Sequence, residues 1–229
     1  MFKLIWWIDV GTCIFASQKK ITMKKTLLIA ALACTTFAVN AQTKMAPVIA
    51  SAAATTNWNL DKSHSSVKFS VDHLVISEVE GNFKMFDGSM KNAAADFTGA
   101  KIDFTVDVKS INTDEEKRDA HLKGEDFFNA EKFPQMKFSS TNFRKVADKK
   151  YLLQGDLTIR DVTKKVAFVV IYGGTTKDPW GNIKAGFKAS TKISRKDYGL
   201  KWNTLLETGG AVVGDEIRIQ VNTEFAQAK

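Results

Sequence analysis

Apolar and polar residues alternate along most of the chain after residue 56. The clearest run places Ile102, Phe104, Val106 and Val108 in one phase, with charged or hydroxyl residues between them. A period of two is typical of a strand that buries one face and exposes the other. The recurring pattern predicts eight strands, near residues 66–73, 79–91, 100–110, 135–146, 150–160, 164–173, 183–194 and 213–225.

One segment departs from this period. Thr113 and Glu116 have the spacing of a capping box, and helix-forming residues follow as far as Lys123, before Gly124. No repeat, linker or charge block divides residues 57–229. We therefore predict one all-β domain, an eight-stranded antiparallel barrel with one short crossover helix, because closing the sheet removes exposed edges.

The N-terminal residues have the features of an export signal. Residues 1–22 show neither a period nor a cap, and Met23 is the better start. Two lysines follow Met23, then an apolar run over residues 26–39 and small residues up to Ala41. We expect cleavage after Ala41, and hence a periplasmic or secreted protein. The run is shorter than the roughly 20 residues of a spanning helix.

Two further expectations concern the same region. Residues 31–34 loosely resemble a lipobox, so lipidation of Cys34 is the alternative to simple cleavage. Residues 42–56 are small, lack aromatic side chains and carry one charge, Lys44, which predicts a flexible leader before the domain.

The predicted cleavage changes the charge. The 229 residues include 33 Lys and Arg against 25 Asp and Glu, a net charge of +8. Loss of residues 1–41 halves this to +4 and removes both cysteines, Cys13 and Cys34. So small an excess, with the aromatic residues in the buried phase, does not favour nucleic-acid binding. A domain without thiols uses no cysteine as nucleophile or metal ligand.

The inward phase of the predicted barrel is almost entirely hydrocarbon. A barrel of eight strands either fills its interior with side chains or holds one small ligand. An apolar cavity cannot compensate the desolvation of a polar ligand, so its ligand would be a hydrocarbon chain. We predict ligand contacts from Phe69, Val71, His73, Phe83, Phe104, Val106, Phe138, Leu157, Phe168, Val170, Phe187 and Trp202.

The domain contains three histidines, His64, His73 and His121. Three histidines can hold zinc, but the nine-residue spacing of His64 and His73 would aim them at opposite faces of a continuous strand. We predict no metal site, and a structural role for His121. His73 is either a buried histidine with a hydrogen-bonded tautomer or a polar contact for a ligand head group.

Arg118 and Arg195 each have an acidic neighbour, Asp119 and Asp197. Ion pairs that hold the helix and the last loops to the barrel are the favoured interpretation. Because a guanidinium matches a phosphate bidentately, both arginines are, with His73, also candidates for contact with a head group. The sequence has no GxSxG motif and no phosphate-binding glycine loop, so we predict no catalytic residue.

Several short motifs follow one another in a specific order: Trp58–Ser65, Phe69–His73, Gly81–Phe83, Arg118–Phe128, Phe133–Pro134, Phe138–Ser139, Gly155–Arg160, Trp180–Gly181, Gly186–Phe187 and Ile193–Leu200. In this order they resemble the YceI-like family of exported polyisoprenoid-binding proteins, over residues 57–226. Two departures are Asp161 and Lys165, where that family usually has Gly and Pro. We expect both to lie in a turn and to alter loop stiffness without changing the barrel.

The resemblance implies a lipocalin-like barrel that encloses an isoprenoid or fatty chain, such as a quinone or polyprenyl phosphate. It implies no catalytic residue and no required cofactor, a hydrophobic lipid as partner, and transient contact with envelope membranes or membrane redox proteins. Whether the chain forms a homodimer stays open. Two alternatives also stay open: an envelope enzyme with His73 as general base, and a filled barrel that serves as a stress-response interaction module.

Overall fold

The computed structural model describes residues 54–204 and 212–229. The predicted signal peptide, its cleavage site, Cys34 and nearly all of the predicted leader therefore lie outside the described residues. Within the two ranges, no helix is both long enough and apolar enough to cross a membrane.

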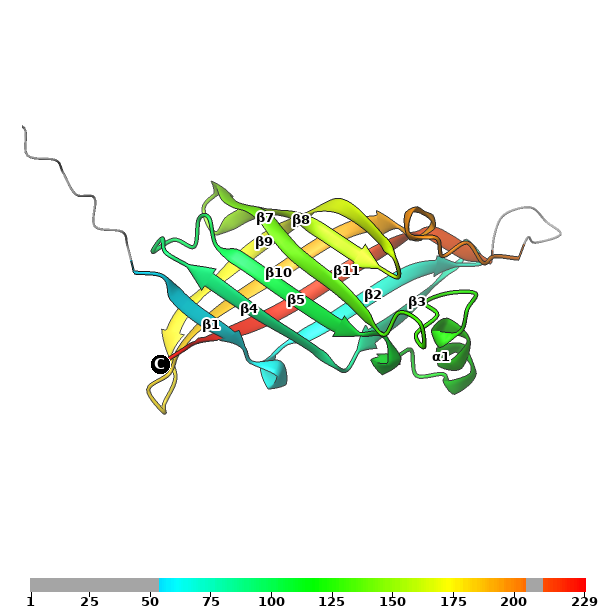
Figure 1. Cartoon of the computed structure of the whole chain (residues 1–229), viewed down its shortest axis with the longest axis horizontal. Helices are drawn as coiled ribbons and strands as arrows, with labels where there is room; N and C mark the ends of the chain where they lie inside the picture. Colours follow the sequence, from blue (N-terminus) through cyan, green and yellow to red (C-terminus); the bar gives the residue numbers. More distant parts are fainter. Residues whose placement is uncertain (1–53, 205–211) are drawn as a thin grey trace, which may run out of the picture. The chain divides into compact units, whose positions relative to one another are not determined.

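One antiparallel sheet contains every strand of the described ranges (Figure 1). The strands are β1 (Thr56–Leu60), β2 (Ser66–His73), β3 (Ser77–Phe83), β4 (Phe86–Asn92), β5 (Lys101–Asp107), β6 (Ile111–Asn112), β7 (Gln135–Ala147), β8 (Lys150–Ile159), β9 (Val162–Lys177), β10 (Ile183–Ser194) and β11 (Val213–Gln227). The helix α1 spans Glu116–Lys123, and three 3₁₀ turns are η1 (Lys62–His64), η2 (Val108–Ser110) and η3 (Arg195–Tyr198).

The sheet closes into a barrel of eight long strands, as predicted. The order around the barrel is β1-β4-β5-β7-β8-β9-β10-β11, and the pairing of β11 with β1 closes the ring. At its other part β11 pairs with β2, and the sheet continues through β3 to β6. Three of the long strands are interrupted: η1 separates β1 from β2, two residues separate β3 from β4, and η2 separates β5 from β6. The predicted range 79–91 covers most of β3 and β4, whereas the range 100–110 covers β5 and η2 and ends before β6. The prediction missed β1 altogether. Alternation continues through a short kink, so the pattern alone does not reveal it.

The helix begins later than the capping box predicted. Its N-cap is Glu115, whose carboxylate accepts hydrogen bonds from the backbone N–H groups of Lys117 and Arg118. Thr113 instead donates its N–H and hydroxyl to the Asp119 carboxylate, at 2.9 and 2.6 Å. The prediction of Thr113 as the cap was therefore wrong, because its hydroxyl and N–H are bound to Asp119 and Glu115 caps the helix two residues later.

The two departures from the family pattern do not share a turn. Asp161 lies with Arg160 in the two-residue connection between β8 and β9. Lys165 lies on β9, opposite Asp156, and its ammonium group is 3.5 Å from that carboxylate. The expectation of a turn position is thus wrong for Lys165. A strand position without proline retains its backbone N–H for the ladder.

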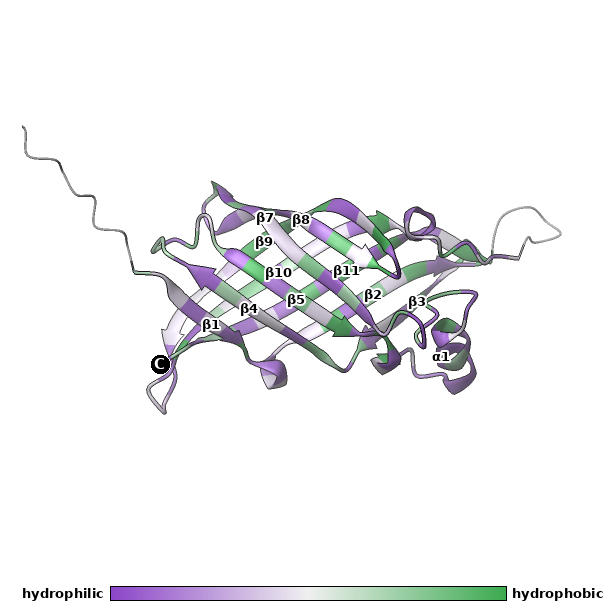
Figure 2. Cartoon of the chain, viewed as in Figure 1, coloured by the Kyte–Doolittle hydropathy of each residue, from purple (hydrophilic) through white to green (hydrophobic). Residues whose placement is uncertain are grey.

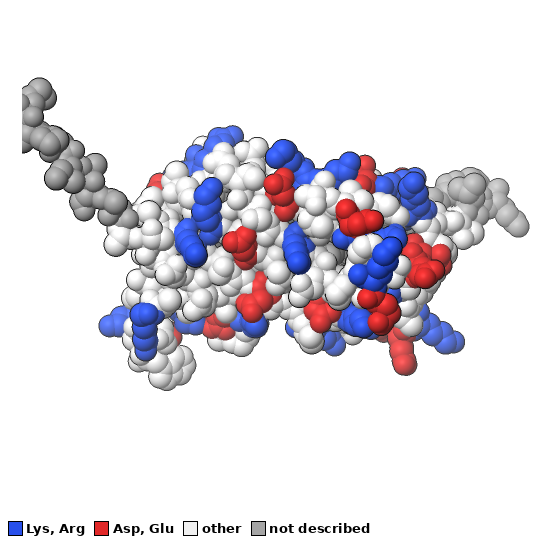
Figure 3. All heavy atoms as spheres, viewed as in Figure 1, with Lys and Arg blue, Asp and Glu red and all other residues white. Residues whose placement is uncertain are grey.

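Hydrophobic and hydrophilic residues alternate along the strands, as Figure 2 shows. On the face in Figure 3, acidic and basic side chains are interspersed. That face therefore lacks the clustered positive charge typical of a nucleic-acid interface.

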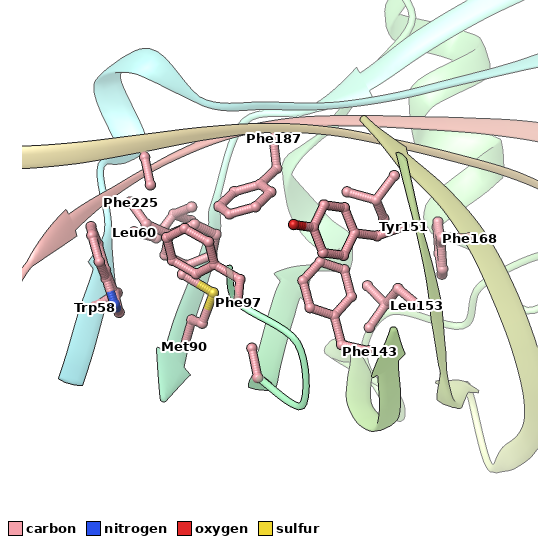
Figure 4. Packing of buried hydrophobic residues seen from close by; sticks show 13 residues of the cluster. Trp58, Leu60, Met90, Phe97, Phe143, Tyr151, Leu153, Phe168, Phe187 and Phe225 are labelled. Carbon is pink, nitrogen blue, oxygen red and sulfur yellow. The ribbon is translucent and has the colours of Figure 1, made fainter. Parts of the chain in front are cut away.

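One end of the barrel, where β1 and the C-terminus lie, is filled by aromatic rings (Figures 1 and 4). We call it the plugged end. Phe97 contacts Trp58 and Phe187 with ring centroids 5.4 and 5.2 Å apart, and Phe143 stacks on Tyr151 at 4.8 Å. Tilted and edge-to-face contacts of this kind add to the free energy gained from burial. The barrel wall is thus tightly packed at this end.

The opposite end carries α1, η3 and the loop between β2 and β3, and we call it the α1 end. Arg160 links its segments, because its guanidinium donates to the backbone carbonyls of Phe127 and Gly199, at 3.2 and 3.3 Å. The two ends therefore differ in how they are closed, one by aromatic packing and the other by short segments held by polar side chains.

Candidate functional site

A cavity of about 220 Å³ lies inside the barrel. Its lining is almost wholly hydrocarbon and comes from most of the strands, from α1 and from η3. An apolar cavity even smaller than this one stays dry and accepts apolar ligands, because water finds too few hydrogen-bond partners there. The interior is therefore not filled by side chains alone, as the filled-barrel alternative requires.

Ten of the twelve residues predicted from alternation as ligand contacts line this cavity. They are Phe69, Val71, Phe83, Phe104, Val106, Phe138, Leu157, Phe168, Val170 and Phe187. The period of two brings them together, because every second side chain of each wall strand points inward. Their contact with a ligand stays a prediction.

The other two residues, His73 and Trp202, do not line the cavity. His73 is the last residue of β2 and is half-buried, so it lies past the inward positions of Phe69 and Val71 on the same strand. The expectation that it points into the cavity is therefore corrected. Trp202 packs instead against His121 and Phe127, with ring centroids 5.0 and 5.3 Å away.

Three cavity rings are positioned by glycines on neighbouring strands. The ring of Phe69 lies over Gly81, that of Phe104 over Gly88, and that of Phe138 over Gly155; a Cβ atom at any of these glycines would overlap the ring. A glycine opposite an aromatic residue lets the ring lie against the wall of the barrel. These glycines keep volume available inside the cavity.

Arg195 is only 3% exposed and lines the cavity, yet its guanidinium is fully engaged. It donates to the backbone carbonyls of Leu200, Trp202, Val213 and Gly214 at 2.7–3.3 Å, and to the Asp215 carboxylate at 3.4 Å. A guanidinium has five N–H donors, so none is left for a ligand. Burial lowers the pKa of Arg195, and Asp215 acts in the opposite direction. This geometry corrects the candidate role of Arg195 in contacting a head group, and its predicted partner Asp197 is not among these acceptors.

Arg118 also has a local role and does not line the cavity. Its Nε donates to the Thr113 hydroxyl and its Nη2 to the Thr113 carbonyl, both at 2.8 Å. Asp119 is bound to the same threonine, so the predicted attachment of the helix is mediated by Thr113. The head-group role of Arg118 stays a prediction, which its position outside the cavity lining does not favour.

His64 lies in η1 and not on a strand. The argument that His64 and His73 face opposite sides of one continuous strand therefore does not apply. The fold brings His64 beside Asp61 and Glu224 in an arrangement that resembles a set of metal ligands. However, the Lys184 ammonium is 2.6 Å from Asp61 and 3.1 Å from Glu224, where it already supplies the positive charge. Lys184 also holds the pKa of the Asp61 carboxyl well below its usual range, helped by hydrogen bonds from Ser63 and His64.

His121 lies on α1 and packs edge-to-face against Phe127, and its Nε2 is 3.0 Å from Asp126. These contacts fit the structural role expected of it.

Several residues of the cavity were not among the predicted contacts. Ile217 and Ile219 follow the alternation of β11 and could have been included on that pattern. Leu122, Phe127 and Tyr198 come from α1, the segment after it and η3, where no period of two applies. Only the arrangement of these short segments across the α1 end places them at the cavity.

Comparisons with known proteins agree with this architecture. Residues 58–225 match the family described as the YceI-like domain. A UPF0312 protein of Staphylococcus aureus strain N315 is 36% identical over 172 residues, which cover 75% of this chain and 98% of that protein. The crystal structure of a YceI protein from Campylobacter jejuni has 35% identity and a TM-score of 0.59, and covers 69% of this chain and 90% of its own.

A polyisoprenoid binding domain from Saccharophagus degradans shares the fold at 13% identity. Its TM-score is 0.54, with 75% of this chain and 98% of that chain covered.

Proposed function

The chain belongs to the YceI-like domain family, and on that premise we propose that it is an exported, non-enzymatic protein that binds an isoprenoid or other long-chain lipid inside its barrel. Quinones and polyprenyl phosphates are the candidate classes, and transport or storage in the cell envelope is the proposed role. The observation that carries this proposal is the hydrocarbon-lined cavity.

The lining of the cavity favours a hydrocarbon chain. A chain that enters it gains about 25 cal/mol for each Å² of apolar surface removed from water. An isoprenoid tail can thus bind tightly without contacts to a head group.

Two further observations support the proposal. The Saccharophagus degradans domain of the same fold is described as polyisoprenoid binding. The features of residues 23–41 support a periplasmic or secreted address, where a lipid carrier would exchange its ligand with envelope membranes or membrane redox proteins.

The enzyme alternative lacks a comparable observation. It requires His73 beside a substrate held in the cavity, and His73 is not part of the lining. We therefore keep the binding protein as the proposed function.

The first test is native mass spectrometry of the protein purified from a bacterial envelope, followed by organic extraction. We expect a stoichiometric isoprenoid or fatty species on a chain that starts at Gln42. A diacylated chain that starts at Cys34 would overturn the predicted cleavage. A ligand-free protein that also takes up no isoprenoid from mixed micelles would overturn the proposed function.

A matched pair of variants locates the binding. Phe104 lines the cavity, whereas the next residue, Thr105, occupies the outward phase of the same strand, β5. We expect Phe104→Asp to abolish lipid uptake, since a carboxylate inside an apolar cavity is not compensated. Thr105→Asp adds the same charge outside and should retain uptake. Circular dichroism would verify that both variants fold, and uptake by a folded Phe104→Asp protein would contradict the proposed site.

A further inference from the structure

One buried side chain of the cavity lining carries a polar group without a hydrogen-bond partner. Tyr198 is 2% exposed and lines the cavity, and its hydroxyl has no hydrogen-bond partner among the described residues. The indole nitrogen of Trp58 and the Nε of Arg160 are also buried without a partner, but neither residue lines the cavity. Of these three buried groups without a hydrogen-bond partner, only the Tyr198 hydroxyl belongs to a residue that lines the candidate binding site.

The packing around Tyr198 is largely apolar. Tyr198 belongs to a buried cluster with Phe127, Leu157, Ile159 and Leu200, all of which also line the cavity. It also borders a second, polar pocket between β9, β10 and η3, but no side chain of that pocket forms a hydrogen bond with the hydroxyl. A buried hydroxyl without a partner is unfavourable, so a bound molecule that offers an acceptor oxygen there gains more than one that does not.

The hydroxyl acts as a donor. Burial raises the pKa of Tyr198 to about 12, so the group keeps its proton at any physiological pH. It can therefore donate a hydrogen bond to a carbonyl, an ether or an alcohol oxygen of a ligand.

The same end of the cavity is poorly suited to a diphosphate. Arg195, the charged group nearest in sequence that lines the cavity, has all its donors engaged by carbonyls and by Asp215. Lys196 is 2.7 Å from Asp215, on the outer side of this network. The two lysines of the lining, Lys68 and Lys137, are exposed and occupy the outward phase of β2 and β7. A multiply charged head group beside Tyr198 would therefore lose its hydration and receive a single hydrogen bond in return, which does not compensate the loss.

We propose that the Tyr198 hydroxyl is the anchor for the ligand's head, and that the barrel selects isoprenoids with a neutral oxygen acceptor over isoprenyl diphosphates. This inference rests on the proposed lipid-binding function and makes it more specific. The remaining lining holds the tail without discriminating between head groups.

The test compares the whole protein with its Tyr198→Phe variant, which lacks a single oxygen atom. Three probes are used after delipidation: a long-chain isoprenoid quinone, the hydrocarbon squalene, and farnesyl diphosphate. We expect the variant to bind the quinone about tenfold more weakly, equivalent to about 1.4 kcal/mol, and squalene as tightly as before. The ligand-free variant should be at least as resistant to urea as the wild type, since it buries no unsatisfied hydroxyl.

Each outcome has a separate meaning. Unchanged quinone affinity in the variant, or an equal loss for quinone and squalene, would overturn the role of Tyr198 and leave the lipid-binding function intact. Wild-type protein that prefers farnesyl diphosphate to the quinone would overturn the selection for a neutral head group. Binding of none of the three probes by wild-type protein would overturn the proposed function, and this inference with it.

Discussion

The two ends of the barrel are closed by different interactions. At the plugged end, Phe97, Phe143 and their aromatic neighbours fill the space between the strands themselves (Figure 4). At the α1 end, closure depends on segments outside the barrel wall, which Arg160 and Arg195 hold through backbone carbonyls. Segments held by a few hydrogen bonds can move without disrupting the strand ladder. We therefore expect ligand to enter and leave at the α1 end.

The largest predicted effect tests the closure of the α1 end by hydrogen bonds from Arg195. Arg195→Met should lower the free energy of unfolding by on the order of 5 kcal/mol, because it removes the guanidinium donor from the carbonyls of Leu200, Trp202 and Gly214. Urea denaturation gives the loss of stability, and stopped-flow release of a fluorescent lipid should show faster exit. The control is Lys196→Met, which removes an exposed cation beside the same Asp215. Near-wild-type stability of Arg195→Met would contradict the assignment of closure to this guanidinium.

The next largest effect tests the closure of the plugged end by aromatic packing. Phe143 is 1% exposed, and Phe143→Ala should destabilise the protein by about 4 kcal/mol, since it leaves a cavity between Tyr151 and Phe187. Denaturation measures this loss, with Val146→Ala, an exposed position on the same strand, as control. Phe143 also lines the cavity, but it lies away from the α1 end, so this variant, unlike Arg195→Met, should leave the rate of lipid release unchanged. Faster release from Phe143→Ala than from Arg195→Met would place the exit at the plugged end.

The difference between the ends also explains what the sequence could predict. Wall strands alternate, so ten cavity residues, including Phe104 and Phe168, follow from a period of two. The α1 end has no such period. Most partners of Arg195 are backbone carbonyls, which any residue type supplies, so the sequence pointed instead to an ion pair with its neighbour Asp197. The Tyr198 hydroxyl lacks a hydrogen-bond partner because of the residues that surround it in space. The sequence motif that contains Tyr198 does not reveal these residues.

Register is the second kind of information that the pattern lacks. Phe69 lies opposite Gly81, and Phe104 opposite Gly88, only because β2 pairs with β3 and β4 with β5 in one particular alignment. A shift of one residue would keep the alternation within each strand and place other side chains opposite these rings. The volume of the cavity therefore depends on strand pairing, which a single sequence does not specify.

The smallest predicted effect concerns the loop between β2 and β3, at the α1 end. Leu74 and Val75 have φ values of 54° and 64°, and Val75 is 77% exposed. Left-handed backbone is unfavourable for these residues, whereas Asn-Gly suits a turn with two consecutive positive φ values. We expect Leu74→Asn combined with Val75→Gly to stabilise the protein by about 1 kcal/mol and to leave lipid affinity unchanged, as thermal unfolding and a binding titration would show. A single Leu74→Asn variant should give part of the gain. Destabilisation by the double variant would mean that contacts of these side chains outweigh the backbone strain, and that this loop takes part in closing the α1 end.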